Sequence, residues 1–429
     1  MAYGAALFAA LGLTPLWLDE ILQFGAQRSL SAGNLLYWAQ INAGASPLPY
    51  LFQHAVVGAL GFSTYAARLP AALCSIGAGA LFALISERFL KRGRTAALAA
   101  FLILPLQFRY GLEARVYSQG LLCALLSLWL FLRLKDRPSP APAALYGFSV
   151  ALGLYSQPLT IFPVLAQVAA ARKLWRFTLP AAAAGAIAYL PWYALQRAAQ
   201  AQRAAFEPPV AFFSPHQLAA LLHDLAGGGY ASSIPLLILA ACAIPSRDRL
   251  LWWMLPAAIA GPILMDAVFN YFFAARQLIF ATPALIFLAA QGADRLRGAR
   301  TGLALAAALL AVYGVSAAQR DLRLATARKD GLAATADAIV AQLGSRTCFS
   351  AVPANQQDFY VFLRPELGGR ACGNQAAFAV LLVASQYTRP LDRESAKARL
   401  RAQSYRVTRI TRIGSSELTL WEPPPFPAQ

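Results

Sequence analysis

Long apolar runs alternate with short polar loops over the first three quarters of the chain. Runs of about 20 apolar residues have the length of a transmembrane helix. We expect about eleven of them, near residues 1–17, 66–88, 95–111, 116–134, 143–157, 158–171, 177–195, 230–245, 251–269, 277–292 and 301–318. Residues 18–65 are more polar and predict an amphipathic loop. The pattern therefore predicts a polytopic α-helical membrane domain over 1–318.

The remaining residues, 319–429, have a different pattern. "DGLAATADAIVAQLG" has helical spacing and ends at Gly344, a residue typical of helix C-termini. "RTCFSAV", "DFYVFL", "AVLLVA" and "SELTLWE" are typical of strands. We predict a small soluble α/β domain here.

Composition supports a membrane protein and excludes a nucleic-acid partner. The 429 residues are 58% hydrophobic and 13% charged, whereas a soluble domain carries about 25% charge. The net charge of +18 could indicate nucleic-acid binding, but the basic residues lie in short loops between apolar runs. The first run lacks a basic start and an obvious cleavage site, so we expect a retained helix rather than a signal peptide.

The distribution of Lys and Arg predicts the orientation in the membrane. One set of alternate loops holds fifteen basic residues: Arg88, Lys91, Arg92, Arg94, Arg133, Lys135, Arg137, Arg172, Lys173, Arg176, Arg247, Arg249, Arg295, Arg297 and Arg300. The other set, up to residue 300, holds seven: Arg28, Arg68, Arg109, Arg115, Arg197, Arg203 and Arg276. Cytoplasmic loops collect basic residues. We therefore expect a cytoplasmic N-terminus and a C-terminal domain on the outer side.

Two adjacent acids, Asp19 and Glu20, follow the first apolar run directly and fall on the predicted outer side. A carboxylate at a membrane boundary indicates function unless a partner explains it. Adjacent carboxylates repel, which tends to raise one pKa unless cations or a metal ion offset them. The alternative is structural, because Asp19 could be the N-cap of a following helix.

A second outer cluster lies in "QFRYGLEARVYSQG", which contains Arg109, Tyr110, Glu113, Arg115 and Tyr117. A spacing of four places Arg109 and Glu113 on one face if the turn is helical. An interfacial belt of Arg and Tyr would explain the cations and the aromatic rings, but explains Glu113 less well.

Arg276 stands alone among aromatic residues in "NYFFAARQLIFATPAL". It could be an interfacial anchor, or a donor to a lipid phosphate, since guanidinium binds two phosphate oxygens at once. Zinc-protease spacing, P-loops, dinucleotide-binding motifs and nucleophile elbows are absent from the sequence. ATP-driven transport by this chain alone is therefore not expected.

Four stretches, in this order, resemble the GT-C membrane glycosyltransferases of the glycosyltransferase family 39 type, which include protein O-mannosyltransferases and the bacterial aminoarabinose transferase. They are "LDEI", "GASPLPYLFQHAVVGALGFSTYAARLPAAL", "EARVYSQGLLCALLSLWLF" and "RQLIFATPALIFLAA". The likeness covers about residues 1–320 and, weakly, the residues that follow. "SPLP" replaces adjacent prolines, and Val116 stands where proline is common, which puts the local helix geometry in doubt.

The resemblance implies an inverting glycosyltransferase of the bacterial inner membrane that takes a sugar from a polyprenyl phosphate on the outer face. It implies Asp19 as general base, with Glu20 and Glu113 as further catalytic candidates. Arg115 and Arg276 would stabilise the donor phosphate, with Arg109 and Tyr117 as further candidates. No cofactor is certain, and a divalent metal ion near Asp19 and Glu20 stays open. The acceptor could be a lipid, a protein or a polysaccharide.

Two other functions stay open from the residues alone. A transporter or flippase of a lipid-linked glycan would also need outer acids and arginines, but would more typically show internal repeats and polar residues at the bilayer midplane. A non-catalytic envelope scaffold is the second alternative.

The cysteines predict one disulfide. Cys348 and Cys372 fall in the C-terminal domain, which we expect in an oxidising compartment. Two buried thiols are the alternative. Cys74, Cys123 and Cys242 lie in apolar runs and are expected to pack there.

Overall fold

The computed structural model describes residues 1–25, 32–41, 46–204, 215–244, 249–269, 274–326, 330–372 and 379–424. The chain forms two compact units. We call Met1–Leu13 with Ala26–Thr326 the helical unit, and Thr14–Gly25 with Ala327–Gln429 the C-terminal unit. The sequence places the domain boundary at 318, whereas helix α16 continues to Thr326. Residues 319–326 extend it because they include good helix formers.

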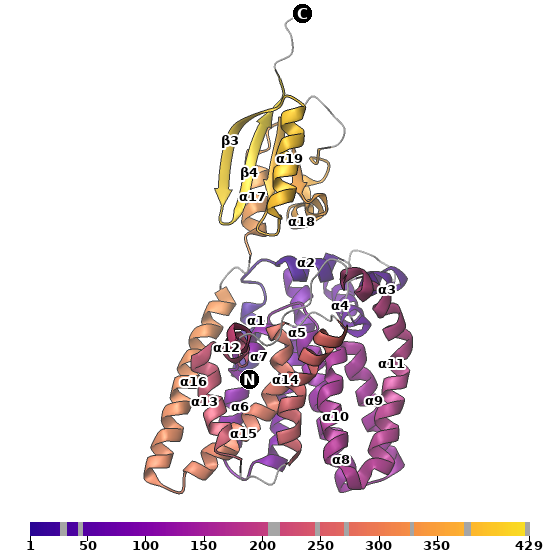
Figure 1. Ribbon diagram of the computed structural model, residues 1–429, viewed down its shortest axis with the longest axis vertical. Coiled ribbons are helices and arrows are strands. Elements are labelled where there is room, and N and C mark those ends of the chain that lie inside the picture. The colour runs from indigo at the N-terminus through magenta and orange to yellow at the C-terminus, as the bar shows by residue number, and fades with distance from the viewer. Residues whose placement is uncertain are drawn as a thin grey trace, which may run out of the picture. The chain divides into compact units, whose positions relative to one another are not determined.

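The helical unit is a bundle (Figure 1). Its helices are α1 (Ala2–Ala10), α3 (Ala32–Ile41), α4 (Pro47–Leu60), α5 (Thr64–Phe89), α6 (Arg94–Leu102), α7 (Pro105–Gly111), α8 (Tyr117–Asp136), α9 (Pro140–Ser156), α10 (Ile161–Ala170), α11 (Trp175–Ala204), α12 (Pro215–Asp224), α13 (Tyr230–Ala241), α14 (Arg249–Phe269), the 3-10 segment η4 (Ala275–Ala281), α15 (Thr282–Leu296) and α16 (Arg300–Thr326). Each predicted apolar run therefore contains helix.

The expected number of about eleven transmembrane helices is not confirmed. Among the described residues, five helices are long and apolar enough to cross a membrane: Thr64–Phe89, Tyr117–Asp136, Arg249–Val268, Ala275–Leu296 and Arg300–Thr326. The predicted run 95–111 is two short helices instead. The break falls at Pro105, and Leu104 before it has extended backbone angles, as residues before proline favour.

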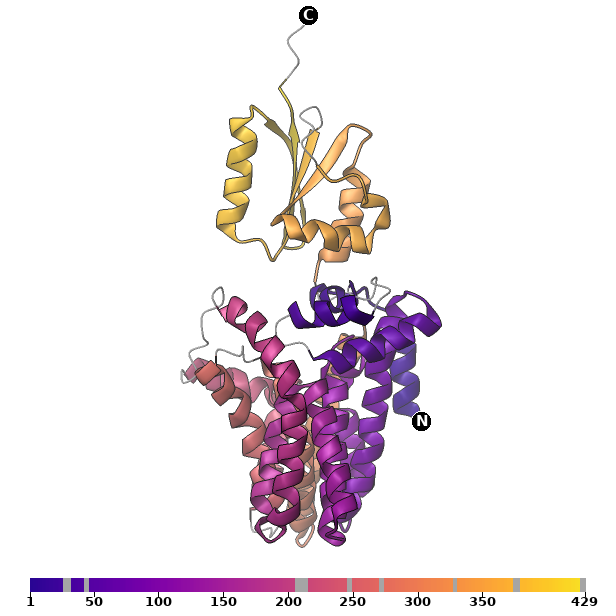
Figure 2. The same cartoon turned by 90° about the vertical axis from the view of Figure 1, so that its right-hand side faces the viewer.

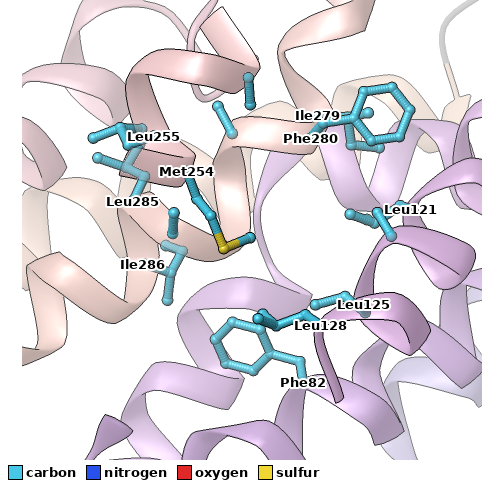
Figure 3. Packing of buried hydrophobic residues seen from close by; sticks show 14 of the residues in the cluster. Phe82, Leu121, Leu125, Leu128, Met254, Leu255, Ile279, Phe280, Leu285 and Ile286 are labelled. Atoms are coloured by element: carbon cyan, nitrogen blue, oxygen red, sulfur yellow. The ribbon is translucent and has the colours of Figure 1, made fainter. Parts of the chain in front are cut away.

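Buried aromatic and aliphatic side chains fill the bundle. The ring of Phe82 in α5 stacks on Phe101, with centroids 4.2 Å apart, and on Phe287, at 4.3 Å. Figure 3 shows Phe82 in the same core as Met254 of α14. Helices α13 and α15 approach so closely that a Cβ at Gly292 would lie 1.7 Å from the Leu239 carbonyl oxygen. Packing of this kind holds the ends of the helices in place.

Two loops of the more basic set contact each other at the ends of α5 and α8. Arg88 at the end of α5 forms an ion pair with Asp136 at the end of α8. The Gln291 side chain in α15 donates to the Phe89 carbonyl over 3.2 Å. The ends of α5 and α8 therefore lie side by side, as expected for two loops that the sequence assigns to the same set.

The C-terminal unit contains a four-stranded sheet in the order β1-β2-β4-β3. Its strands are β1 (Thr347–Val352), β2 (Ala379–Ala384), β3 (Arg406–Ile413) and β4 (Ser416–Glu422), and its helices are α2 (Leu18–Gly25), α17 (Leu332–Gln342), α18 (Gln357–Leu363) and α19 (Pro390–Ala402). β1 and β2 are parallel, and the other pairs are antiparallel. Helix α19 covers one face of the sheet, and α17 and α18 lie on the other (Figure 2).

Two strand expectations differ from this sheet. "DFYVFL" is not a strand but most of helix α18, because a short apolar run without alternation fits a buried helix as well as a strand. The edge strand β3 is not among the predicted strands. Six of its eight residues, including its arginines, are exposed, so it lacks the apolar pattern by which the other strands are found.

Candidate functional site

The predicted site residues fall into two groups, one in each unit. Asp19 and Glu20 belong to the C-terminal unit, together with residues more than 300 positions later in the chain. Glu113, Arg109, Arg115, Tyr117 and Arg276 belong to the helical unit. Each group has its own geometry.

Asp19 and Glu20 lie in the first turn of the short helix α2. The helix begins at Leu18, so Asp19 is its second residue and not its N-cap. Glu20 is fully buried, and its Oε2 accepts the backbone N–H of Trp17 over 3.3 Å. A glutamate that reaches back to the residue before a helix is half of a capping box. The structural role considered for Asp19 therefore falls to Glu20, and Asp19 stays partly exposed.

A third acid of this group, Asp330, is not among the residues that the sequence pattern indicates. Its Oδ2 accepts the backbone N–H of Leu18 over 2.9 Å, and its Oδ1 accepts the N–H of Leu332 over 3.2 Å. The Tyr387 hydroxyl donates to Oδ2 over 3.3 Å. Burial raises the pKa of Asp330, and the nearby Glu20 raises it further. No local motif marks Asp330, because its partner Leu18 is 312 residues away.

In the helical unit, Arg109 and Glu113 form the pair that their spacing predicts. Arg109 Nε donates to Glu113 Oε1 over 2.6 Å, and only 1% of the Glu113 side chain is exposed. Arg109 comes from the last turn of α7, and Glu113 follows that helix. The buried acid therefore pairs with an arginine, and a catalytic role for Glu113 stays a prediction.

Two tyrosine rings and Arg276 form the adjoining part of this group. The rings of Tyr110 and Tyr117 lie 4.7 Å apart, and the guanidinium carbon of Arg276 lies 5.8 Å from the Tyr117 ring centroid. Segment η4, which carries Arg276, packs against α8, which begins at Tyr117. Cation–π contact orients a guanidinium, and a guanidinium can bind phosphate oxygens through its edge.

Arg115 lies in the short connection from Glu113 to α8 and is partly exposed. Its backbone N–H donates to the Glu113 carbonyl over 2.6 Å, a tight turn that reverses the chain within this connection. The group thus contains three arginines and one buried acid, a net positive set suited to an anion.

The described residues hold no group of three or more His, Cys, Asp or Glu side chains arranged to bind a metal ion. Metal dependence remains a prediction.

Cys348 of β1 and Cys372 are joined by a disulfide, with Cα atoms 5.0 Å apart. The backbone N–H of Cys372 also donates to the Phe349 carbonyl over 2.9 Å. The bridge attaches the connection before β2 to the edge strand, as the cysteine positions predict. Among the described residues, Cys74, Cys123 and Cys242 are free thiols.

Comparison with known proteins finds similarity in structure. No protein-family model matches the sequence, and no curated protein matches it. The structure of ArnT from Cupriavidus metallidurans bound to undecaprenyl phosphate is similar over 98% of this chain and 96% of that chain, with a TM-score of 0.58 and 15% identity. The apo state of that protein is similar over 97% and 96%, with a TM-score of 0.58 and 14% identity. This likeness confirms the resemblance to the GT-C transferases for the fold: the chain has the fold of ArnT.

Proposed function

We propose that this protein is an integral membrane glycosyltransferase that moves a sugar from a polyprenyl phosphate to an acceptor hydroxyl. The observation that carries the proposal is the likeness to ArnT bound to undecaprenyl phosphate, which extends over nearly the whole of both chains. The five apolar helices long enough to cross a membrane support it. Fold alone does not imply function, so the roles of particular residues need their own support.

In the proposed reaction, Asp19 is the general base. It removes the proton from the acceptor hydroxyl as that oxygen attacks the anomeric carbon. The bond from the anomeric carbon to the phosphate oxygen breaks, and the polyprenyl phosphate leaves with the electron pair. One displacement from the opposite side inverts the anomeric configuration. Its position beside a capping glutamate, with its own side chain partly exposed, supports this role for Asp19 rather than for the buried Glu20.

The leaving phosphate needs cationic stabilisation, and the helical unit supplies candidates for it. Arg276 is oriented by the Tyr117 ring and is partly exposed, as is Arg115. Arg109, whose Nε donates to Glu113, is a further candidate. Arginine is suited to this task since its planar fork can bind two phosphate oxygens.

The proposed location is the bacterial inner membrane, with the N-terminus in the cytoplasm and the C-terminal unit in the periplasm. The excess of fifteen basic residues over seven between alternate loops supports this orientation. The acceptor on the outer face would be a lipid, a protein or a polysaccharide of the envelope.

Transfer of label tests the proposal. The purified protein in lipid vesicles is mixed with a polyprenyl phosphate carrying a radiolabelled sugar and with an envelope extract as acceptor. We expect label in an acceptor product, with inverted anomeric configuration by NMR, and release of unlabelled polyprenyl phosphate. Movement of the labelled lipid between leaflets without product would indicate a flippase instead.

A further inference from the structure

We infer that Asp330 is a positioning residue for Asp19: its carboxylate holds the start of helix α2 in the C-terminal unit and thereby fixes the backbone beside the catalytic acid. This inference rests on the role proposed for Asp19. The first observation is the composition of the C-terminal unit, in which Thr14–Gly25 groups with Ala327–Gln429. Contacts within the unit must hold this early segment against a domain that follows it by 300 residues in the chain.

The two oxygens of Asp330 bind the starts of two helices. Oδ2 accepts from Leu18, the first residue of α2, and Oδ1 accepts from Leu332, the first residue of α17. The first N–H groups of a helix have no partner within it, and negative charge there is favourable. One carboxylate therefore serves both helix N-termini. Leu18 is the residue before Asp19, so this hydrogen bond restrains the backbone from which the Asp19 side chain projects.

Further contacts restrain α2 within the same unit. The Phe24 ring near the end of α2 packs edge-on against Phe362 of α18, with centroids 6.1 Å apart. Glu20 caps the helix by accepting from Trp17. The Tyr387 hydroxyl donates to Asp330 and orients its carboxylate. Asp330 thus restrains the start of α2, and the contact between Phe24 and Phe362 restrains its end.

A positioning role predicts a particular kinetic effect. Displacement of a catalytic group by about 1 Å can reduce turnover by about 10²-fold. Loss of Asp330 should therefore lower kcat and leave the donor KM near its wild-type value, because the proposed phosphate ligands belong to the helical unit. Asp330→Asn retains one acceptor oxygen, whereas Asp330→Ala retains none. The order of turnover should be wild type, then Asn, then Ala.

The experiment combines turnover with hydrogen exchange on the full-length protein. We expect Asp330→Ala to lower kcat at least about tenfold, and to speed amide exchange over residues 16–24 while exchange in β1 and β2 stays unchanged. Asp330→Asn should show a smaller form of both effects. The control is Asp337→Asn, which removes an acid of helix α17 that pairs with Arg364. It should leave the exchange of residues 16–24 and the turnover unchanged.

Three outcomes would overturn the inference. The first is unchanged exchange over residues 16–24 in both Asp330 variants. The second is faster exchange there with unchanged turnover. The third is faster exchange throughout the sheet in Asp330→Asn, which would indicate a general structural role. A wild-type protein without transferase activity would contradict the proposed function, while the exchange data would still decide whether Asp330 holds the segment.

Discussion

Arg109 and Glu113 form a hydrogen-bonded ion pair over 2.6 Å in which the acid is almost completely buried and the arginine is 34% exposed. A buried charge is stable only when it is paired. The arginine lies in the last turn of α7, and the glutamate lies in the short connection that follows this helix. The pair therefore also fixes the turn that leads into Tyr117. Glu113 stays a catalytic candidate from its sequence position, and its pairing predicts a structural role as well.

This role predicts the effect of removing the charge. Glu113→Gln should lower the free energy of unfolding by about 1–3 kcal/mol, because a hydrogen bond to a charged group is lost and Arg109 keeps an unbalanced charge. Thermal unfolding in detergent measures it. Glu87→Gln is the matched control, since Glu87 is 63% exposed and lies 3.7 Å from Arg94. A variant with wild-type stability and abolished turnover would indicate a catalytic role for Glu113 instead.

The contact between Arg276 and Tyr117 predicts an effect on donor use. Arg276→Lys keeps the charge but loses the guanidinium group that donates to two phosphate oxygens at once. The KM for the polyprenyl-phosphate sugar should therefore rise about tenfold, which corresponds to the lower end of the free energy of a hydrogen bond to a charged group. Tyr117→Phe keeps the ring under the guanidinium and should change the KM little, whereas Tyr117→Leu should raise it. If kcat and KM were unchanged in Arg276→Lys, Arg276 would be an interfacial anchor.

Local patterns in the sequence predicted the parts of this protein that depend on neighbours in the chain. The spacing of Arg109 and Glu113 predicted their pair, and the apolar runs predicted helices in the correct places. Helix lengths were predicted less well, because proline divides the run 95–111 at Pro105. Such breaks shorten the helices and so reduce the number that are long enough to cross a membrane. A hydropathy average over a window of residues does not reveal these breaks.

Long-range contacts could not be predicted in this way. Nothing near Asp330 in the sequence indicates that its carboxylate accepts from Leu18, and nothing near Asp19 indicates that its segment belongs to the C-terminal unit. The edge strand β3 was missed for a related reason. Its exposed arginines are typical of an edge that resists pairing with another chain, and only its pairing with β4 identifies it as a strand.

The disulfide predicts a loss of stability on reduction. Cys348 and Cys372 are separated by 24 residues, and closing a loop of this size restricts the unfolded chain by about 3 kcal/mol in the chain-entropy model. Cys348→Ser with Cys372→Ser should therefore speed hydrogen exchange in β1 and β2. Cys242→Ser, which removes a free thiol, is the control. Alkylation of both Cys348 and Cys372 in the unreduced, denatured protein would contradict the bridge.

The ion pair between Lys397 of α19 and Glu417 of β4 predicts a pH dependence. The hydrogen bond from Lys397, 2.8 Å long, lowers the pKa of Glu417 below its ordinary value of 4.5, and the charges of Lys397, Arg393 and Arg412 act in the same direction. The unfolded chain then binds the proton more tightly than the folded one. The stabilisation is complete above about pH 4.5 and is lost as the pH falls through the lowered pKa.

Glu417→Gln should therefore flatten the acid side of a plot of stability against pH, measured by thermal unfolding of the full-length protein between about pH 3 and pH 6. Glu394→Gln is the control, because Glu394 is 59% exposed and lies 3.6 Å from Lys397. An acid side equally steep in the wild type and in Glu417→Gln would mean that other groups carry the dependence.

Turnover of the Asp19→Asn variant tests whether Asp19 is the general base, because asparagine keeps the shape of the side chain and cannot accept the proton. The assay follows transfer of label from a polyprenyl-phosphate sugar, with Asp358→Asn, an exposed acid of the same unit, as the control for expression and folding. We predict a loss of at least about 10²-fold in kcat for Asp19→Asn and near wild-type turnover for the control. Near wild-type turnover in Asp19→Asn, at normal expression, would contradict the account.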